Sequence, residues 1–110
     1  FTTPEDVAAL AQPVLLHRIM DYAVEIARNT RKSRYLTLGA SPRAAIALVR
    51  AARSRAYLEG RSFTTPEDVA ALAQPVLLHR LILSAQARLE GKKEKDVLQE
   101  AMRAAKVPVL

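Results

Sequence analysis

The sequence contains no cysteine and no tryptophan, and it has only three glycines, three tyrosines and two phenylalanines. Without cysteine the chain can form neither disulfides nor thiolate metal sites, which agrees with a reducing compartment. No apolar run approaches the roughly 18 to 20 residues that a membrane helix needs, and no targeting segment is visible. These absences predict a cytoplasmic protein that does not insert into a membrane.

What remains is rich in helix-forming residues. Half of the 110 residues are hydrophobic, and alanine is the most abundant of them. This length is enough for one domain with a modest core, and the composition is typical of an all-helical protein. We therefore predict an all-α fold, a small helical bundle of helix-strand-helix units with very short β pairing.

Residues 1–18 recur without a single change as residues 63–80. An old natural duplication would have diverged at exposed positions such as Ala8/Ala70, because surface substitutions there cost almost nothing. The sequence also opens in phase with the copy and lacks an initiator methionine. We interpret the repeat as a recent addition to an engineered, recombinant protein. The chain is accordingly divided into a duplicated strand-helix segment, residues 1–18, and a helical domain, residues 19–110.

Each copy opens with a strong helix-start signal, Thr-Pro-Glu-Asp. Threonine can cap the helix, proline suits its first position, and the two carboxylates lie where the helix dipole favours them. This placement explains the acidic pairs without a catalytic role; they are Glu5, Asp6, Glu67 and Asp68. A second proline then removes one backbone hydrogen bond, at Pro13 and at Pro75. We expect a kink or a break there in each copy, and one helix over residues 13–30 after the first of these.

Two short β-prone pieces, residues 35–38 and 62–65, can pair as a minimal sheet. Between them, residues 42–59 are predicted to form the central buried helix, closed by Gly60. Its expected core positions are Ala45, Leu48, Val49, Ala52 and Ala56, with Ile46 and Ala47 widening the stripe. Further helices are expected over residues 84–90 and 94–105, the latter burying Val97, Leu98, Ala101, Met102 and Ala105. The tyrosines Tyr22, Tyr35 and Tyr57 are too scattered for a base-stacking platform and are expected as partly buried anchors.

One short stretch carries a chemical signal, Gly39-Ala40-Ser41-Pro42-Arg43. It places Ser41 at the cap of the central helix and Arg43 in the first turn, where a cation opposes the helix dipole. An anion beside Arg43 would remove that conflict, because free amides and a guanidinium together bind phosphate. The alternative from spacing alone is an arginine that faces solvent after an ordinary cap.

The chain strongly resembles the C-terminal helical lid of MoxR-type AAA+ ATPases over residues 19–109. Several separated motifs occur in the order and spacing of that family: Ile26-Ala-Arg-Asn-Thr-Arg31, Leu38-Gly-Ala-Ser-Pro-Arg43-Ala44, Gly60-Arg-Ser-Phe-Thr-Thr-Pro-Glu-Asp-Val69, Val76-Leu-Leu-His-Arg80, Leu89-Glu-Gly91 and Val107-Pro-Val. The resemblance implies that Arg43, with Ser41 beside it, takes the place of the sensor 2 arginine, which reaches from the lid to the nucleotide phosphates on the neighbouring α/β subdomain.

The sequence lacks the parts of the family that perform hydrolysis. It contains no Gly-x-x-x-x-Gly-Lys-Ser/Thr loop and no strand ending in a magnesium-binding acid. We therefore predict a non-enzymatic chain without a cofactor of its own, in which ATP is a ligand only of the parent full-length enzyme.

The net charge of +6 raises nucleic acid as a partner. The densest cationic stretch is residues 28–34, and its candidate nucleic-acid residues are Arg28, Arg31, Lys32 and Arg34. Acidic residues are interspersed almost everywhere else, which favours a solvated basic face. For Arg31, a contact with nucleotide or with a neighbouring subunit and a favourable place at a helix C-terminus remain alternatives.

The two histidines, His17 and His79, are the same position in the two copies. Neither has a second histidine or an acidic partner at metal-ligand spacing within its copy. We expect structural roles for both and no metal site.

The repeat also suggests how the chain assembles. AAA+ lids are similar to the histone fold, in which short strands pair between two chains, and a second Phe-Thr-Thr-Pro strand would supply a spare partner for such an exchange. We predict an engineered lid that probes this relation and forms a homodimer or larger assembly by segment exchange. Two alternatives stay open: a histone-like DNA-binding dimer, and a natural regulatory lid fragment of an ATPase.

Overall fold

The computed structural model describes the backbone of residues 4–109 and the side chains of residues 15–109. Helix α1 (Pro4–Lys32) is followed by strand β1 (Leu36–Leu38), helix α2 (Pro42–Leu58) and helix α3 (Pro66–Leu77). A 3-10 turn, η1 (Leu78–Arg80), leads to strand β2 (Ile82–Leu83) and to helices α4 (Ala85–Leu89) and α5 (Glu94–Ala104). The all-α prediction with very short β pairing is confirmed. In the described residues no helix is long and apolar enough to span a bilayer.

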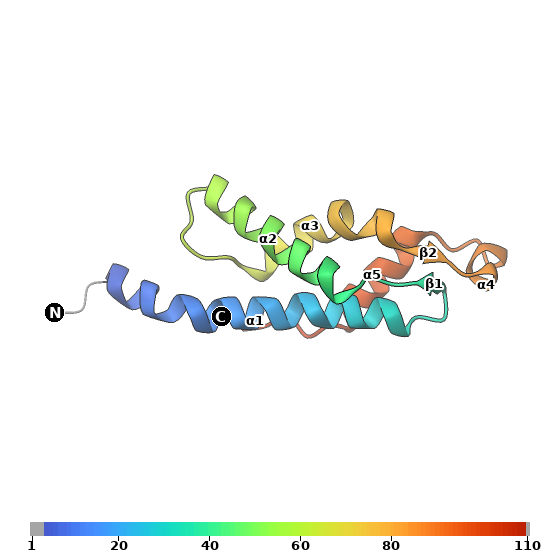
Figure 1. Cartoon of the computed structure of the whole chain (residues 1–110), viewed down its shortest axis with the longest axis horizontal. Helices are drawn as coiled ribbons and strands as arrows, with labels where there is room; N and C mark the ends of the chain where they lie inside the picture. The colour runs from blue at the N-terminus through green and yellow to red at the C-terminus, as the bar shows by residue number, and fades with distance from the viewer. Residues whose placement is uncertain (1–3, 110) are drawn as a thin grey trace.

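Figure 1 shows an elongated bundle in which α1 runs along one side and α2 and α3 lie across from it. The C-terminal tail returns along α1, where the Arg18 guanidinium donates to the Val109 carbonyl at 2.6 Å. The core lies between α1, α2, α3 and α5. Its largest fully buried apolar side chains are Ile19, Ile26, Leu48, Val69, Leu77, Val97 and Leu98.

Of the predicted kink or break at Pro13, the break is wrong, because α1 is one helix from Pro4 to Lys32 and passes through the end of the first copy at Arg18. A proline removes one hydrogen bond from a helix, but packing of the buried face that follows Pro13 stabilises the continuous helix. That face consists of Ile19, Tyr22, Ala23 and Ile26, all at most 5% exposed.

The second copy follows the prediction more closely. Pro75 lies inside α3, two residues before that helix ends, and the chain then tightens into η1. Leu81, the first residue after the copy, is extended and buried, whereas its counterpart Ile19 is helical and buried. Identical sequences therefore end differently because the residues that follow them pack in different places.

The predicted pairing of residues 35–38 with residues 62–65 is also wrong. β1 pairs antiparallel with β2, with Leu36 opposite Leu83 and Leu38 opposite Ile82. Residues 62–65 form a loop instead, in which Thr65 caps α3. The corresponding piece of the first copy, residues 1–3, lies outside the described residues.

Helix α2 occupies the predicted central position, and the five expected core residues are buried together with Ala44. Ile46 was predicted to widen this buried stripe but is 42% exposed, so that prediction is wrong. The interpretation of the tyrosines as partly buried anchors fits Tyr35, whereas Tyr22 is buried in the core at 5% exposure and Tyr57 is 79% exposed. In α5 the expected residues face inward, with Met102 partly buried. Gly60 ends α2 with a φ of +77°.

Candidate nucleotide-phosphate site at the start of helix α2

The first turn of α2 is built around Ser41. Its hydroxyl accepts a hydrogen bond from the Ala44 amide at 3.2 Å, and its carbonyl accepts from the amides of Ala44 and Ala45. Pro42 has no N–H to offer. Among the described residues this leaves Arg43 with a free backbone amide and a guanidinium that makes no hydrogen bond or ion pair.

Arg43 is exposed, and the first turn of α2 contains no acidic residue. A cation in this position is unfavourable next to the positive end of the helix dipole, unless an anion neutralises both. Guanidinium groups and free helix N-terminal amides are both donors to anions such as phosphate. The first turn of α2 thus has an exposed cation and no carboxylate that would repel an anion.

The segment before Ser41 is fixed to the end of α1. The buried Thr30 hydroxyl donates to the Ala27 carbonyl at 2.6 Å and accepts from the Ala40 amide at 2.8 Å. The Arg31 guanidinium donates to the Ala40 carbonyl at 2.7 Å. Gly39 lies close to the backbone of Arg31, and a Cβ at position 39 would be 2.7 Å from the backbone nitrogen of Arg31. We name Thr30, Arg31, Gly39 and Ala40 the α1 clasp, and it sets where the first turn of α2 begins.

The candidate nucleic-acid residues lie in the last turns of α1 and just after it, and several of them have other partners. Arg31 belongs to the α1 clasp, and the Arg34 guanidinium donates to the Tyr35 hydroxyl at 2.8 Å and lies over its ring. Arg28 and Lys32 line a groove that also contains the carboxylates of Asp21 and Glu25. All four cations are exposed, and Lys32 lines one pocket with Arg28 and another with Arg34, so nucleic-acid binding through them stays a prediction.

The start of α3 holds a charged cluster that sequence reasoning missed. The Asp68 side chain is fully buried, and it accepts from both terminal nitrogens of Arg61, at 2.6 and 2.8 Å, and from Arg55. The Thr65 amide adds a hydrogen bond at 2.8 Å. These donors, Arg61 foremost, hold the pKa of Asp68 well below its usual range. Glu59 also binds Arg61, at 2.7 Å, and the pKa of Arg61 is raised in turn.

This cluster, which we name the Asp68 clamp, corrects the interpretation of Asp68 as a carboxylate that only complements the helix dipole. The capping box from Thr65 to Asp68 is visible in the sequence. The other signal in the sequence was the presence of two arginines, Arg55 and Arg61, upstream of the capping box. Their convergence on one carboxylate depends on how α2 packs against α3.

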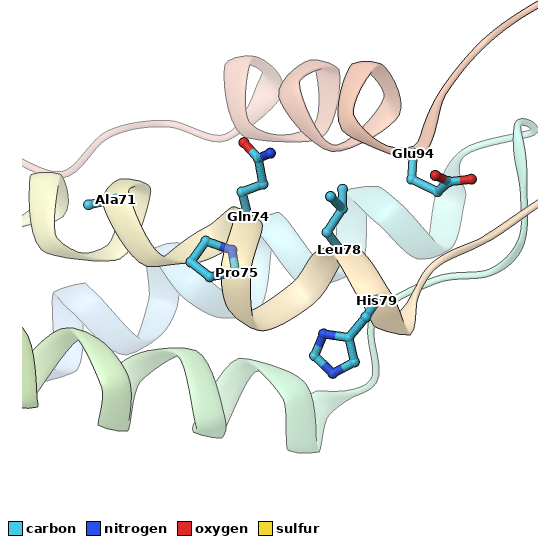
Figure 2. Close-up of a pocket in the computed structure, with 6 residues that line it drawn as sticks. All are labelled: Ala71, Gln74, Pro75, Leu78, His79 and Glu94. Atoms are coloured by element: carbon cyan, nitrogen blue, oxygen red, sulfur yellow. The ribbon is translucent and has the colours of Figure 1, made fainter.

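A groove of about 540 Å³ lies between α3 and α5, lined by Ala71, Gln74, Pro75, Leu78, His79 and Glu94. Figure 2 shows the side chains of His79 and Glu94 pointing away from each other, so they do not form an acid-base pair. In the first copy, His17 lies 3.5 Å from Asp21, and both are largely exposed. No group of three metal-ligating side chains occurs among the described residues.

Comparison with known proteins was consistent with the resemblance seen in the sequence. The profile of the AAA lid domain family matches residues 28–101. The chain is 42% identical over 91 residues to YeaC, an uncharacterized protein of Bacillus subtilis, and 33% identical over 101 residues to the chaperone MoxR1 of Mycobacterium tuberculosis. These matches cover 83% and 84% of the chain but only 28% and 27% of the relatives.

A crystal structure of a candidate ATPase from Cytophaga hutchinsonii superposes with a TM-score of 0.75 at 29% identity. The match covers 84% of this chain and 31% of the crystallised one. The chain thus spans less than a third of the length of the proteins it resembles.

Proposed function

Since the chain belongs to the AAA lid domain family, we propose that it acts as the lid of a MoxR-type ATPase and presents Arg43 to the phosphates of a bound nucleotide. The observation that carries this proposal is the exposed, unpaired Arg43 guanidinium in a first turn without acidic residues. The α1 clasp supports it, because bonds from Thr30 and Arg31 hold the start of that turn in place. A fixed donor binds a phosphate at a lower entropic cost than a mobile one.

A lid exchange tests this proposal. Residues 19–109 of this chain would replace the matching segment of the Cytophaga hutchinsonii protein, and ATP hydrolysis would be measured. We expect Arg43→Ala to lower the rate by about 10- to 100-fold, which corresponds to the loss of one or two charge-assisted hydrogen bonds. Arg103→Ala, which removes an exposed cation from α5, is the matched control and should leave the rate unchanged. Equal rates for Arg43→Ala and the parent exchange protein would refute the proposed contact.

For the isolated chain we expect no ATP hydrolysis and no tight ATP binding. The two donors at Arg43 replace only a small part of the amides, lysine and magnesium ligands that a phosphate loop supplies. Calorimetry should therefore give an affinity weaker than about 10 micromolar. A tighter affinity would contradict the prediction and would show that the lid alone holds the nucleotide.

A second copy of this chain is the partner that we propose for the isolated protein. The second of the two identical segments forms α3 and packs against α2, and its residues Val69, Ala73 and Leu77 are fully buried. Residues 4–18 of the first segment form the start of α1 and continue without a loop into residues 19–32, so the first segment is tied to a different place. Its apolar residues Val7, Leu10 and Val14 have side chains outside the described part of the structure. Covering them with another chain would remove apolar surface from water.

Light scattering should accordingly report a dimer or a larger assembly. We expect the double variant Leu10→Asp, Leu15→Asp to dissociate it and to remain folded. The same change in the second copy, Leu72→Asp with Leu77→Asp, should unfold the chain, because Leu77 is fully buried. A monomer at high micromolar concentration would contradict the proposal of segment exchange.

The engineered origin and the link to the histone fold are also proposals. The unbroken identity of residues 1–18 and 63–80 supports a designed addition. The sheet of the lid pairs β1 with β2 of the same chain. A histone-like assembly would instead pair short strands of two chains, and a structure of the oligomer would distinguish the two arrangements.

A further inference from the structure

The outer face of α2 presents a cationic groove that the proposed nucleotide contact does not use. The groove measures about 540 Å³ and is lined by Arg50, Arg53, Ser54, Tyr57 and Leu58. We name it the α2 groove. In the view of Figure 1, α2 lies along one edge of the bundle, and the side chains of Arg50, Arg53, Tyr57 and Leu58 are exposed. It is therefore open to a partner.

Within the described side chains, residues 15–109, the two arginines of the α2 groove have no counterion. Helix α2 contains no acidic residue from Pro42 to Leu58, and among the described residues Arg50 and Arg53 form no ion pair. The carboxylates of Glu59, which directly follows α2, and of Asp68 both pair with Arg55 and Arg61. The carboxylates in and around the Asp68 clamp are therefore neutralised by Arg55 and Arg61. Arg50 and Arg53 stay without an ion pair among the described residues.

Large apolar surface accompanies these charges. Tyr57 is 79% exposed and Leu58 is 83% exposed. Tyrosine and arginine are the side chains most enriched where proteins bind proteins, and they form the energetically dominant contacts there. An aromatic ring and a leucine next to two free guanidiniums offer both apolar contact and charge complementarity to the same occupant.

We propose that the α2 groove is a docking surface for an acidic protein segment that carries apolar anchor residues. Two cations along one helix are few for nucleic acid, which is bound through many phosphates at once. The exposed Leu58 gains no apolar contact from a phosphate backbone, whereas an apolar side chain of a protein segment can bury it. The proposal does not depend on a nucleotide at Arg43.

The test uses the full chain and a fluorescently labelled synthetic peptide of Glu-Glu-Leu repeats, with a matched peptide of Gln-Gln-Leu repeats and a short DNA duplex. Fluorescence anisotropy should show binding of the acidic peptide only. We expect the double variant Arg50→Gln, Arg53→Gln to weaken it by about tenfold or more, and Tyr57→Ser by a similar factor. The affinity for the acidic peptide should fall as the salt concentration rises, because salt screens the attraction between exposed charges.

The control is the double variant Arg88→Gln, Arg103→Gln, which removes the same charge from exposed positions on α4 and α5. It should bind the acidic peptide within about twofold of the unchanged protein, because only the net charge differs. Equal weakening by both double variants would overturn the proposal, since general attraction to a cationic protein would then explain the binding. No binding of the acidic peptide at about 1 mM, or binding of the DNA alone through Arg50 and Arg53, would overturn it as well.

Discussion

Asp68→Asn is expected to destabilise the protein by about 3–5 kcal/mol, the largest effect of any single substitution considered. The carboxylate is fully buried and accepts hydrogen bonds from Arg55, Arg61 and Thr65. An amide of the same size removes the negative charge and leaves two arginines facing each other beside the core. Urea unfolding followed by circular dichroism measures the loss.

Asp96→Asn is the matched control. Asp96 occupies the same position of a capping box, at the start of α5, and accepts from the Lys93 amide at 3.2 Å. It is exposed and has no arginine partner among the described residues, so we expect a loss below about 1 kcal/mol. Equal losses for the two variants would show that helix capping, and not the Asp68 clamp, accounts for the effect.

Because of the same carboxylate, we expect the protein to lose stability at low pH. The pKa of Asp68 is lowered in the folded state from an ordinary value of 3.8. A group whose pKa is depressed on folding contributes stability that is complete above its unfolded pKa and is lost as the pH falls toward its folded pKa. We expect the free energy of unfolding to decrease when the pH is lowered from about 4. This dependence on pH should be weaker in Asp68→Asn.

Gly39→Ala is expected to destabilise the protein by about 2–3 kcal/mol. A Cβ at this position would lie 2.7 Å from the Arg31 nitrogen, 2.8 Å from the Arg31 Cα and 2.8 Å from the Thr30 carbonyl carbon. These are backbone atoms, so no side chain can turn away to make room. The clash can be relieved only by separating β1 from the end of α1, which breaks the bonds to Ala40.

The glycine at position 91 provides the comparison. Gly91 has a φ of +74° and nothing within 4 Å of an added Cβ. Gly91→Ala should therefore cost only about 1 kcal/mol, through its left-handed backbone. Thermal unfolding should show a drop in Tm for Gly39→Ala that is about twice as large. Amide hydrogen exchange at Ala44 should also accelerate in Gly39→Ala alone, and unchanged exchange there would contradict a role of the α1 clasp in positioning the start of α2.

Local signals in the sequence were enough to predict most of the helices. The central helix begins at Pro42 because Ser41 caps it, and it ends before Gly60 because that residue adopts a left-handed conformation. The spacing of Leu48, Val49 and Ala52 identified its buried face. The cation of Arg43 in the first turn was likewise visible in the sequence, since caps and helix positions depend on neighbouring residues alone.

The sequence by itself determined the helical class, the central helix, the repeat and the position of Arg43. The tertiary structure decided which strand pairs with β1 and how each copy of the repeat ends, because packing across the chain selects among local conformations of similar energy. It also decided that Arg55 and Arg61 converge on Asp68 while Arg50 and Arg53 stay unpaired. Spacing along one helix cannot show which charges a second helix will neutralise.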